Sequence, residues 1–148
     1  MGKRRLAREY CLQALYLADI GNLNTDEISK ALYFQREKLR DHASFAFASR
    51  LVSGTLANLP FIDSVIQEHA KNWKISRMSA TDRCILRMAV YEIIFTVPTP
   101  ILVIIDEAIE LGKKYSTENS GAFINGVLDR IKEIRNNLPF QSETQNES

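Results

Sequence analysis

The 148-residue sequence contains only six glycines, four prolines and two cysteines. So little glycine and proline excludes a collagen-like or low-complexity chain, and a hydrophobic fraction of 45% excludes a disordered one. The longest clear apolar run covers residues 101–105, whereas a membrane helix needs about 20 apolar residues. No apolar segment with a small-residue cleavage site follows the basic start, so no secretory signal is indicated. These absences predict one soluble, cytoplasmic globular domain.

Residues that commonly carry catalysis are also scarce. The two histidines lie in no metal-binding pattern, and Cys11 and Cys84 are far apart in apolar surroundings, which is typical of buried, reduced thiols. Gly121 and Gly126 have the outer spacing of a phosphate-binding loop, but Val-Leu follows where Lys-Ser or Lys-Thr is required. We therefore expect a protein that is not an enzyme and that needs neither a cofactor nor a metal.

The charge of the chain is small but unevenly distributed. The net charge of +1 does not by itself indicate a nucleic-acid partner. However, the first eight residues contain Lys3, Arg4, Arg5 and Arg8 and no acidic residue, and the other 15 basic and 18 acidic residues carry a net charge of −3. On a helix, arginines at this spacing lie close together and can bind phosphates or stack on unpaired bases. A solvated basic start without a ligand is the alternative.

Apolar residues recur at helical spacing along the chain, which predicts an all-α fold. Breaker and capping residues divide it into about seven helices, close to residues 3–20, 25–40, 41–60, 62–73, 79–94, 100–111 and 120–134. The fifth is apolar on nearly all sides, so we expect it to be the central buried helix. Three helices and then four would form two packed subdomains of a single domain, residues 1–138, followed by a polar, frayed tail, residues 139–148.

Several local features of these helices can be predicted. The expected N-caps are Thr25, Asp41, Ser79 and Ser120. The carboxylates of the sixth helix, Asp106, Glu107 and Glu110, are expected on a solvated face. Asn125-Gly126 ordinarily indicates a hairpin turn, but helical spacing continues on both sides of it. We therefore expect Gly126 inside the last helix, where it would let a neighbouring helix approach closely.

Four segments carry a resemblance to a known family. They are residues 8–16 (REYCLQALY), 86–92 (LRMAVYE), 105–111 (IDEAIEL) and 123–129 (FINGVLD). In order and spacing they resemble the signatures of the NusB family of bacterial transcription antitermination factors, across roughly residues 4 to 138. One such block is weakly specific, whereas four in register are specific.

The resemblance implies an all-α fold of two helical subdomains and a function without catalysis. Members of the family pair with NusE, a protein of the small ribosomal subunit that doubles as a transcription factor. The heterodimer binds the single-stranded boxA sequence of nascent RNA, notably in rRNA leaders, and helps to load an antitermination complex on RNA polymerase. Members occur as monomers and as homodimers, and the sequence selects neither state.

The resemblance also implies roles for individual residues. The implied RNA-binding residues are Arg4, Arg5 and Arg8, with Lys3 as an electrostatic helper, and Phe123 with Asn119 as its polar neighbour. Leu6 interrupts the arginine run of some members, which predicts a weaker patch. For Phe123 the alternative is a place in the core stripe with Val127 and Ile131.

Two further residues are implied to bind NusE, namely Tyr16 and Asp82. A tyrosine suits an interface because one end of its side chain is apolar and the other forms hydrogen bonds. The alternative for Asp82 is local, as a cap of its own helix. Many members carry Glu at this position, and the shorter Asp reduces the reach of an ion pair.

Two other functions fit the sequence. One is a helical protein-interaction module whose basic start is incidental. The other is an RNA-binding partner of an rRNA-modifying enzyme, because rRNA cytosine methyltransferases carry a similar helical domain. This chain has no cofactor-binding glycine-rich loop and no catalytic cysteine motif, so that function would require a separate catalytic subunit.

Overall fold

The structure is a computed structural model that describes residues 2–138. Within this range the chain forms nine α-helices, one short 3-10 helix and no strand, which confirms the all-α prediction. The helices are α1 (Lys3–Gly21), α2 (Thr25–Ala31), α3 (Tyr33–Glu37), α4 (His42–Ala57), α5 (Leu59–His69), η1 (Ile75–Arg77), α6 (Ala80–Phe95), α7 (Ile101–Tyr115), α8 (Ser120–Ile131) and α9 (Glu133–Asn136). The predicted tail, residues 139–148, lies outside the described residues.

Two of the predicted helices are interrupted in the structure. The predicted 25–40 helix breaks at Leu32, whose φ of −101° and ψ of 23° differ from helical values, and α3 follows. In the same way α9 follows α8 after Lys132, although this residue keeps helical torsions. Ile28 and Leu39 are buried on either side of the first break. Apolar spacing alone therefore does not reveal an interruption of one residue.

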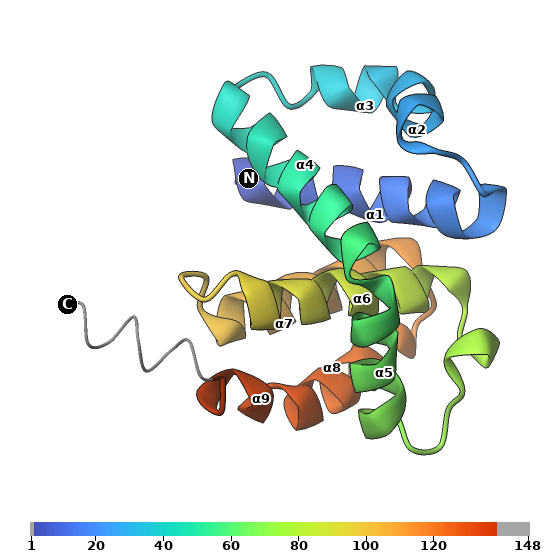
Figure 1. Ribbon diagram of the computed structural model, residues 1–148, viewed down its shortest axis with the longest axis vertical. Coiled ribbons are helices and arrows are strands. Elements are labelled where there is room, and N and C mark those ends of the chain that lie inside the picture. Colours follow the sequence, from blue (N-terminus) through green and yellow to red (C-terminus); the bar gives the residue numbers. More distant parts are fainter. Residues whose placement is uncertain (1, 139–148) are drawn as a thin grey trace.

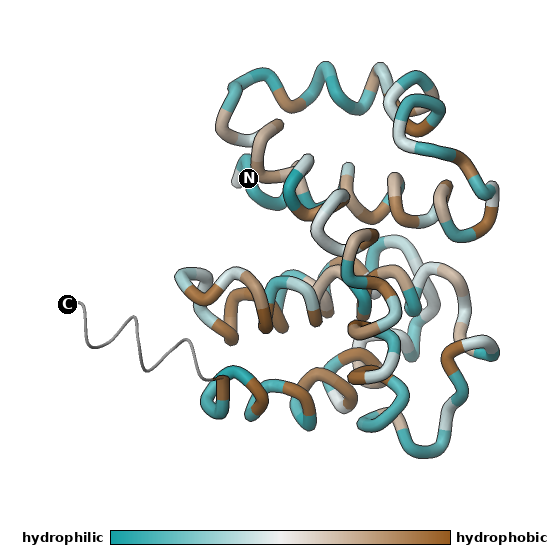
Figure 2. Tube along the Cα trace, in the orientation of Figure 1, coloured by the Kyte–Doolittle hydropathy of each residue, from teal (hydrophilic) through white to brown (hydrophobic). Residues whose placement is uncertain are grey.

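The helices form two layers that correspond to the predicted subdomains (Figure 1). Helices α1 to α4 make the upper layer and α5 to α9 the lower one, and α4 and α5 are bent by 77° where they meet. Figure 2 shows that hydrophilic residues dominate α2 and α3, the outermost helices of the upper layer. In the described range no single helix has the length and apolarity to cross a membrane, and α4 and α5 meet such a criterion only as this bent pair.

Helix α6 is the centre of the fold, as predicted. It packs against α1, α4, α5, α7, α8 and α9, and one continuous cluster of buried apolar side chains includes residues of both layers. Cys84 on α6 and Cys11 on α1 are buried free thiols. Burial raises the pKa of Cys84 to about 12, so this thiol stays protonated at neutral pH.

The charged residues of α6 are paired with neighbouring helices. Arg83 and Arg87 both bond to Asp19 of α1, at N–O distances of 2.6 and 3.0 Å, and Arg87 also bonds to Asp63 of α5 at 2.8 Å. Burial acts to raise the pKa of Asp19, but the hydrogen bonds from the two arginines outweigh it, so this pKa is lowered. The network joins α1 and α5 to the central helix.

Arg135 of α9 forms hydrogen bonds with the C-terminal end of α6. Its side chain is buried, and its Nε and Nη2 atoms donate to the carbonyl oxygens of Ile93 and Glu92 at 2.8 and 3.0 Å. The same guanidinium also donates to the carbonyl oxygens of Thr96 and Thr99. Carbonyl groups in the last turn of a helix lack partners within the helix, and Arg135 supplies a donor to the carbonyl of Ile93. The carbonyl of Glu92 also accepts from the backbone N–H and the hydroxyl of Thr96.

The helix caps agree with prediction at two of four positions. Asp41 and Ser79 are confirmed, because each accepts a hydrogen bond from the backbone N–H three residues later, at 2.8 and 3.1 Å. Thr25 and Ser120 are wrong as caps, since each is the first residue of its helix rather than the residue before it. Asn24 caps α2 instead, in a reciprocal capping box with the third helical residue.

Two glycines allow close contact between helices, and they differ from the one predicted. A Cβ atom at Gly54 of α4 would overlap the ring of Tyr91, and one at Gly112 of α7 would lie 2.7 Å from Cδ1 of Ile124. Gly126 lies within α8, which confirms the predicted helix over the alternative turn. A Cβ atom there would meet no heavy atom within 4 Å, so the predicted close approach at Gly126 is wrong.

Candidate nucleic-acid interface

The first turn of α1 carries two exposed cations. Lys3 Nζ lies 3.5 Å from Oδ2 of Asp41, and its side chain is 76% exposed. The guanidinium of Arg4 stacks over the ring of Phe47 in α4, with Cζ 4.0 Å from the ring centroid. This turn contains no acidic residue, and the unpaired N–H groups at a helix start add positive potential. Lys3 and Arg4 are therefore placed to attract anions such as phosphate.

Arg5 lies at the edge between α1 and α7. Its Nε and Nη2 atoms donate to the two carboxylate oxygens of Glu107, each at 2.9 Å, and its side chain remains 31% exposed. The hydrogen bond to Glu107 raises the pKa of Arg5 and lowers that of Glu107. Asp106 and Glu110 are exposed, as expected for a solvated face of α7. The same expectation is wrong for Glu107, which is partly buried and pairs with Arg5 of α1.

Arg8 is buried and does not belong to the exposed cluster. Its Nε and Nη2 atoms donate to Oε2 and Oε1 of Glu92 in α6, at 2.9 and 2.7 Å, and the two side chains are only 4% and 1% exposed. Ala7 and Cys11, its neighbours on the inner face of α1, are buried as well. A carboxylate buried in the central helix needs a counter-charge, and Arg8 provides it. The structure therefore places Arg8 in the core and outside the exposed cluster, and its implied role in RNA binding stays a prediction.

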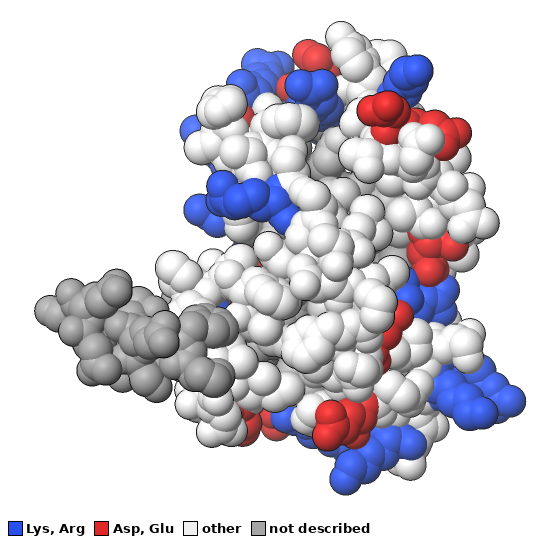
Figure 3. Space-filling view, in the orientation of Figure 1, with Lys and Arg blue, Asp and Glu red and all other residues white. Residues whose placement is uncertain are grey.

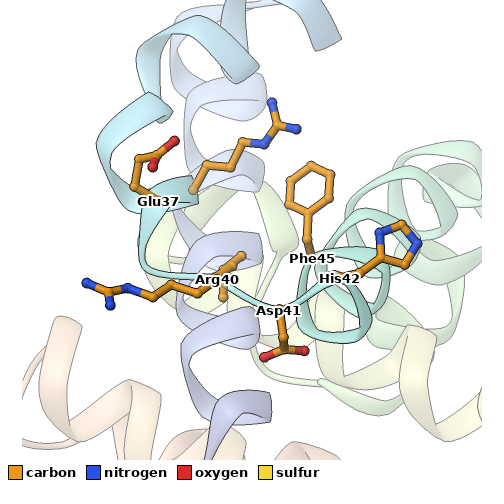
Figure 4. Close-up of a pocket in the computed structure, with 7 residues that line it drawn as sticks. Glu37, Arg40, Asp41, His42 and Phe45 are labelled. Atoms are coloured by element: carbon orange, nitrogen blue, oxygen red, sulfur yellow. The ribbon is translucent and has the colours of Figure 1, made fainter.

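The segment from the end of α3 to the start of α4 adds cations that form no motif in the sequence. It borders an open hollow of about 730 Å³, where the guanidinium of Arg36 lies 4.3 Å from the ring centroid of Phe45. Figure 4 shows Arg40 extending away from the Phe45 ring and His42, on α4, next to that ring. Asp41 also lines the hollow, and its hydrogen bonds from the backbone and hydroxyl of the third α4 residue lower its pKa. That carboxylate is thus engaged by its own helix.

We call Lys3, Arg4, Arg36 and Arg40 the basic end of the molecule. Figure 3 shows Lys and Arg side chains gathered over the N-terminus of α1 and the α3–α4 connection. The ion pair between Lys3 and Asp41 joins these two segments. Guanidinium groups bind phosphate oxygens with two parallel hydrogen bonds, so the basic end suits a polyphosphate chain such as RNA.

A second candidate surface lies at the starts of α6 and α8. It is a groove of about 320 Å³ lined by Trp73, Arg77, Met78, Ser79, Asp82, Thr117, Asn119, Ser120 and Phe123. Phe123 is partly buried against the core, as the core alternative expects, and it also lines the groove, where its predicted contact with RNA stays a prediction. Asn119 is the exposed N-cap of α8, and its side chain makes no capping hydrogen bond.

Asp82 is held within this groove by serine hydroxyls. Its carboxylate accepts hydrogen bonds from Oγ of Ser116 at 2.7 Å and Oγ of Ser120 at 3.1 Å. The cap of α6 is Ser79, so the suggestion that the Asp82 side chain caps its own helix is wrong. The carboxylate instead links the start of α6 to the connection between α7 and α8.

Tyr16, the other residue implied to bind a protein partner, lies on the adjoining surface. It is 40% exposed and lines a mainly apolar hollow of about 260 Å³ with Leu12, Leu17, Thr81 and Tyr115. Thr81 directly precedes Asp82 in α6, so the hollow and the groove meet at the start of this helix. The structure therefore brings Tyr16 and Asp82 into one region.

The predicted RNA-binding residues are not brought together in the same way. Asn119 and Phe123 lie beside Asp82 of α6, whereas Arg8 lies beside Glu92 of the same helix. Asp82 and Glu92 are ten residues apart, or about 15 Å along the helix axis. The basic residues of α1 and the pair of Asn119 and Phe123 thus belong to two regions, one toward each end of α6.

Comparison with known proteins identifies the family. A sequence model of the NusB family matches residues 5–133. The chain belongs to the NusB family. The transcription antitermination protein NusB of Elusimicrobium minutum (strain Pei191) is 50% identical over 138 residues, which are 93% of this chain and 98% of that protein.

Solved structures of NusB proteins share this fold. NusB of T. maritima superimposes with a TM-score of 0.79 at 35% identity, over 93% of this chain and 99% of that one. A crystal structure of the antitermination factors NusB and NusE in complex with dsRNA gives a TM-score of 0.80 at 29% identity, over 89% and 97% of the two chains. The resemblance seen in the four sequence segments is confirmed, and the roles of individual residues remain predictions.

Proposed function

We propose that this NusB-family chain is a transcription antitermination factor that binds boxA-type RNA together with NusE and acts notably in rRNA transcription. The observation that carries this conclusion is the match to the NusB family along residues 5–133. Relatives that share 50% and 43% of their residues with this chain are transcription antitermination proteins. A protein of this kind works by binding and performs no catalysis.

Two surfaces of the molecule support binding to single-stranded RNA. The basic end offers phosphate-binding groups, whereas the groove at the starts of α6 and α8 offers an aromatic ring and a free amide, from Phe123 and Asn119. Arg5 contributes the exposed part of its side chain. RNA would then contact Lys3, Arg4 and Arg5 at one end of α6 and the groove at the other.

The region around Tyr16 and Asp82 is the proposed NusE surface. Tyr16 presents a half-exposed ring above an apolar hollow, as an anchor residue of an interface does. Through NusE and RNA the chain would join the antitermination complex on RNA polymerase, which places its action in the cytoplasm. A homodimer and a monomer are both compatible with this function.

The test is RNA affinity with and without NusE at two salt concentrations, measured by fluorescence anisotropy of labelled boxA RNA. We expect selective binding to boxA over a scrambled RNA, strengthened by NusE. A double variant, Lys3→Ala with Arg4→Ala, should reduce the slope of log affinity against log salt by about 0.7 for each lost phosphate contact. The matched control is Lys113→Ala with Lys132→Ala, which removes an exposed cation from α7 and a half-exposed one from the start of α9.

Two results would contradict the proposal. Failure of the wild-type chain to bind boxA RNA at micromolar concentration, with NusE present, would exclude the function. Binding of NusE without any effect on RNA would instead favour a protein-interaction module with an incidental basic start. An unchanged salt slope in the Lys3 and Arg4 variant would exclude these two residues as phosphate contacts.

A further inference from the structure

Trp73, the one tryptophan of the sequence, is exposed beside the groove. Its side chain is 56% exposed, and its ring meets that of Phe123 edge to face, with 5.8 Å between centroids. A tryptophan that only completed a core would be largely buried, because its apolar surface is large. Here more than half of the Trp73 surface remains open to solvent beside a second ring, and we call these two rings the aromatic platform.

The backbone around this platform is held in place. The amide of Gln67 donates from Nε2 to the carbonyl oxygen of Trp73 and accepts from the backbone N–H of Ile75, both at 3.0 Å. From the other side, Nη1 of Arg83 donates to the carbonyl oxygens of Ile75 and Met78, each at 3.0 Å. The segment from Trp73 to η1 is thus fixed by two side chains from α5 and α6, and the platform is preorganised.

Three cations lie on the connection that carries Trp73, and one carboxylate lines the groove. Arg77 lines the groove and is exposed, and Lys71 and Lys74 are exposed on the same connection. The groove carboxylate, Asp82, is already engaged by two serine hydroxyls. Asn119, which also lines the groove, has an amide without a capping partner. These groups complement a phosphate and the polar edge of a base.

We propose that Trp73, Arg77 and Phe123 form a binding site for one unpaired RNA base and its phosphate. This inference rests on the proposed function, that the chain binds single-stranded RNA. The base stacks on the open aromatic surface, Asn119 forms hydrogen bonds with its edge, and Arg77 contacts the phosphate. The groove volume of about 320 Å³ lies at the lower end of the range of small-ligand sites, roughly 300–1,000 Å³.

The intrinsic fluorescence of Trp73 tests the site directly, because no other tryptophan contributes. Titration of boxA RNA into the chain should quench this fluorescence, since the base stacks on the indole. Trp73→Ala should weaken RNA affinity of the complex with NusE by roughly 5- to 150-fold, the range of one stacked base. Trp73→Phe should restore most of the affinity, and Phe34→Ala, which removes a 78% exposed aromatic ring from α3, is the control that should change nothing.

RNAs with a single abasic position locate the stacked base. One abasic position should weaken binding of the wild type and have no further effect on the Trp73→Ala variant. If the wild type binds boxA RNA but shows no quenching, and Trp73→Ala binds equally well, the site is excluded while the proposed function stands. Loss of NusE binding by Trp73→Ala would show a protein contact instead and overturn the inference. If the wild type binds no RNA at all, both fail.

Discussion

The buried ion pair between Arg8 and Glu92 should be one of the most sensitive positions of the fold. Arg8→Met removes two charge-assisted hydrogen bonds of 2.9 and 2.7 Å and leaves a carboxylate that is 1% exposed without a counter-charge. Loss of one partner of such a pair costs about 3–5 kcal/mol of unfolding free energy. For a chain of this size this corresponds to a decrease in Tm of roughly 10 °C. Urea denaturation and thermal melts followed by circular dichroism measure both quantities.

The double variant Arg8→Met with Glu92→Leu provides the control. It removes both charges and fills the space with apolar atoms, so it should recover much of the stability lost by either single change, as a double-mutant cycle would show. Its RNA affinity and salt slope should equal those of the wild type, because Arg8 is not at the surface. The reasoning is refuted if Arg8→Met costs less than about 1 kcal/mol, if the two changes simply add, or if the double variant loses a phosphate contact.

Three further predictions concern stability. Gly54→Ala should lower Tm because its Cβ would overlap the ring of Tyr91. Gly126→Ala should instead raise the unfolding free energy by about 0.5–1 kcal/mol, because its Cβ meets open space within a helix. Similar effects of the two changes in thermal melts would contradict this reasoning. The pKa of Asp19 is lower in the folded chain than its value of about 3.8 in the unfolded chain. The ionised carboxylate therefore stabilises the fold above pH 3.8, and this stabilisation is lost as the pH falls through the pKa of the folded state. Asp19→Asn should therefore be less stable than the wild type at pH 7 and closer to it in urea melts at pH 3; an equal gap at both pH values would exclude the linkage. Thr55 is fully buried, and its hydroxyl has no hydrogen-bond partner among residues 2–138, so Thr55→Val should keep or increase stability. A loss above about 1 kcal/mol in urea melts would indicate a missed hydrogen bond.

The parts of the fold that depend on local pattern could be predicted from the sequence. Helical spacing locates every long helix, and the apolar surface of residues 79–94 correctly predicts a central α6. The cap Asp41 could be predicted because its partner is only three residues away. These features depend on neighbours in the sequence, where spacing and side-chain type are sufficient.

Features that depend on contacts between distant residues could not be predicted. Arg4, Arg5 and Arg8 are equivalent in sequence, but their partners on α4, α7 and α6 direct one to the surface, one to an edge and one into the core. Gly126 is different, because helical spacing places it opposite the buried stripe of Ile124, Val127 and Ile131. Its open side could therefore have been predicted, and the expected close approach there went against the pattern. The contact of Trp73 with Phe123 joins positions fifty residues apart, and no single segment contains that information.

Arg135 has a consequence for the order in which the chain folds. It supplies hydrogen bonds to the end of α6 from 42 and 43 residues further along the sequence. During synthesis from the N-terminus, α6 emerges well before Arg135, which donates to the carbonyl groups of Ile93 and Glu92 at its end. The central helix therefore reaches its final stability only when α9 docks, so a nascent chain that stops short of Arg135 would expose an incomplete core to chaperones and proteases. The end of the central helix is thus completed by the last described helix.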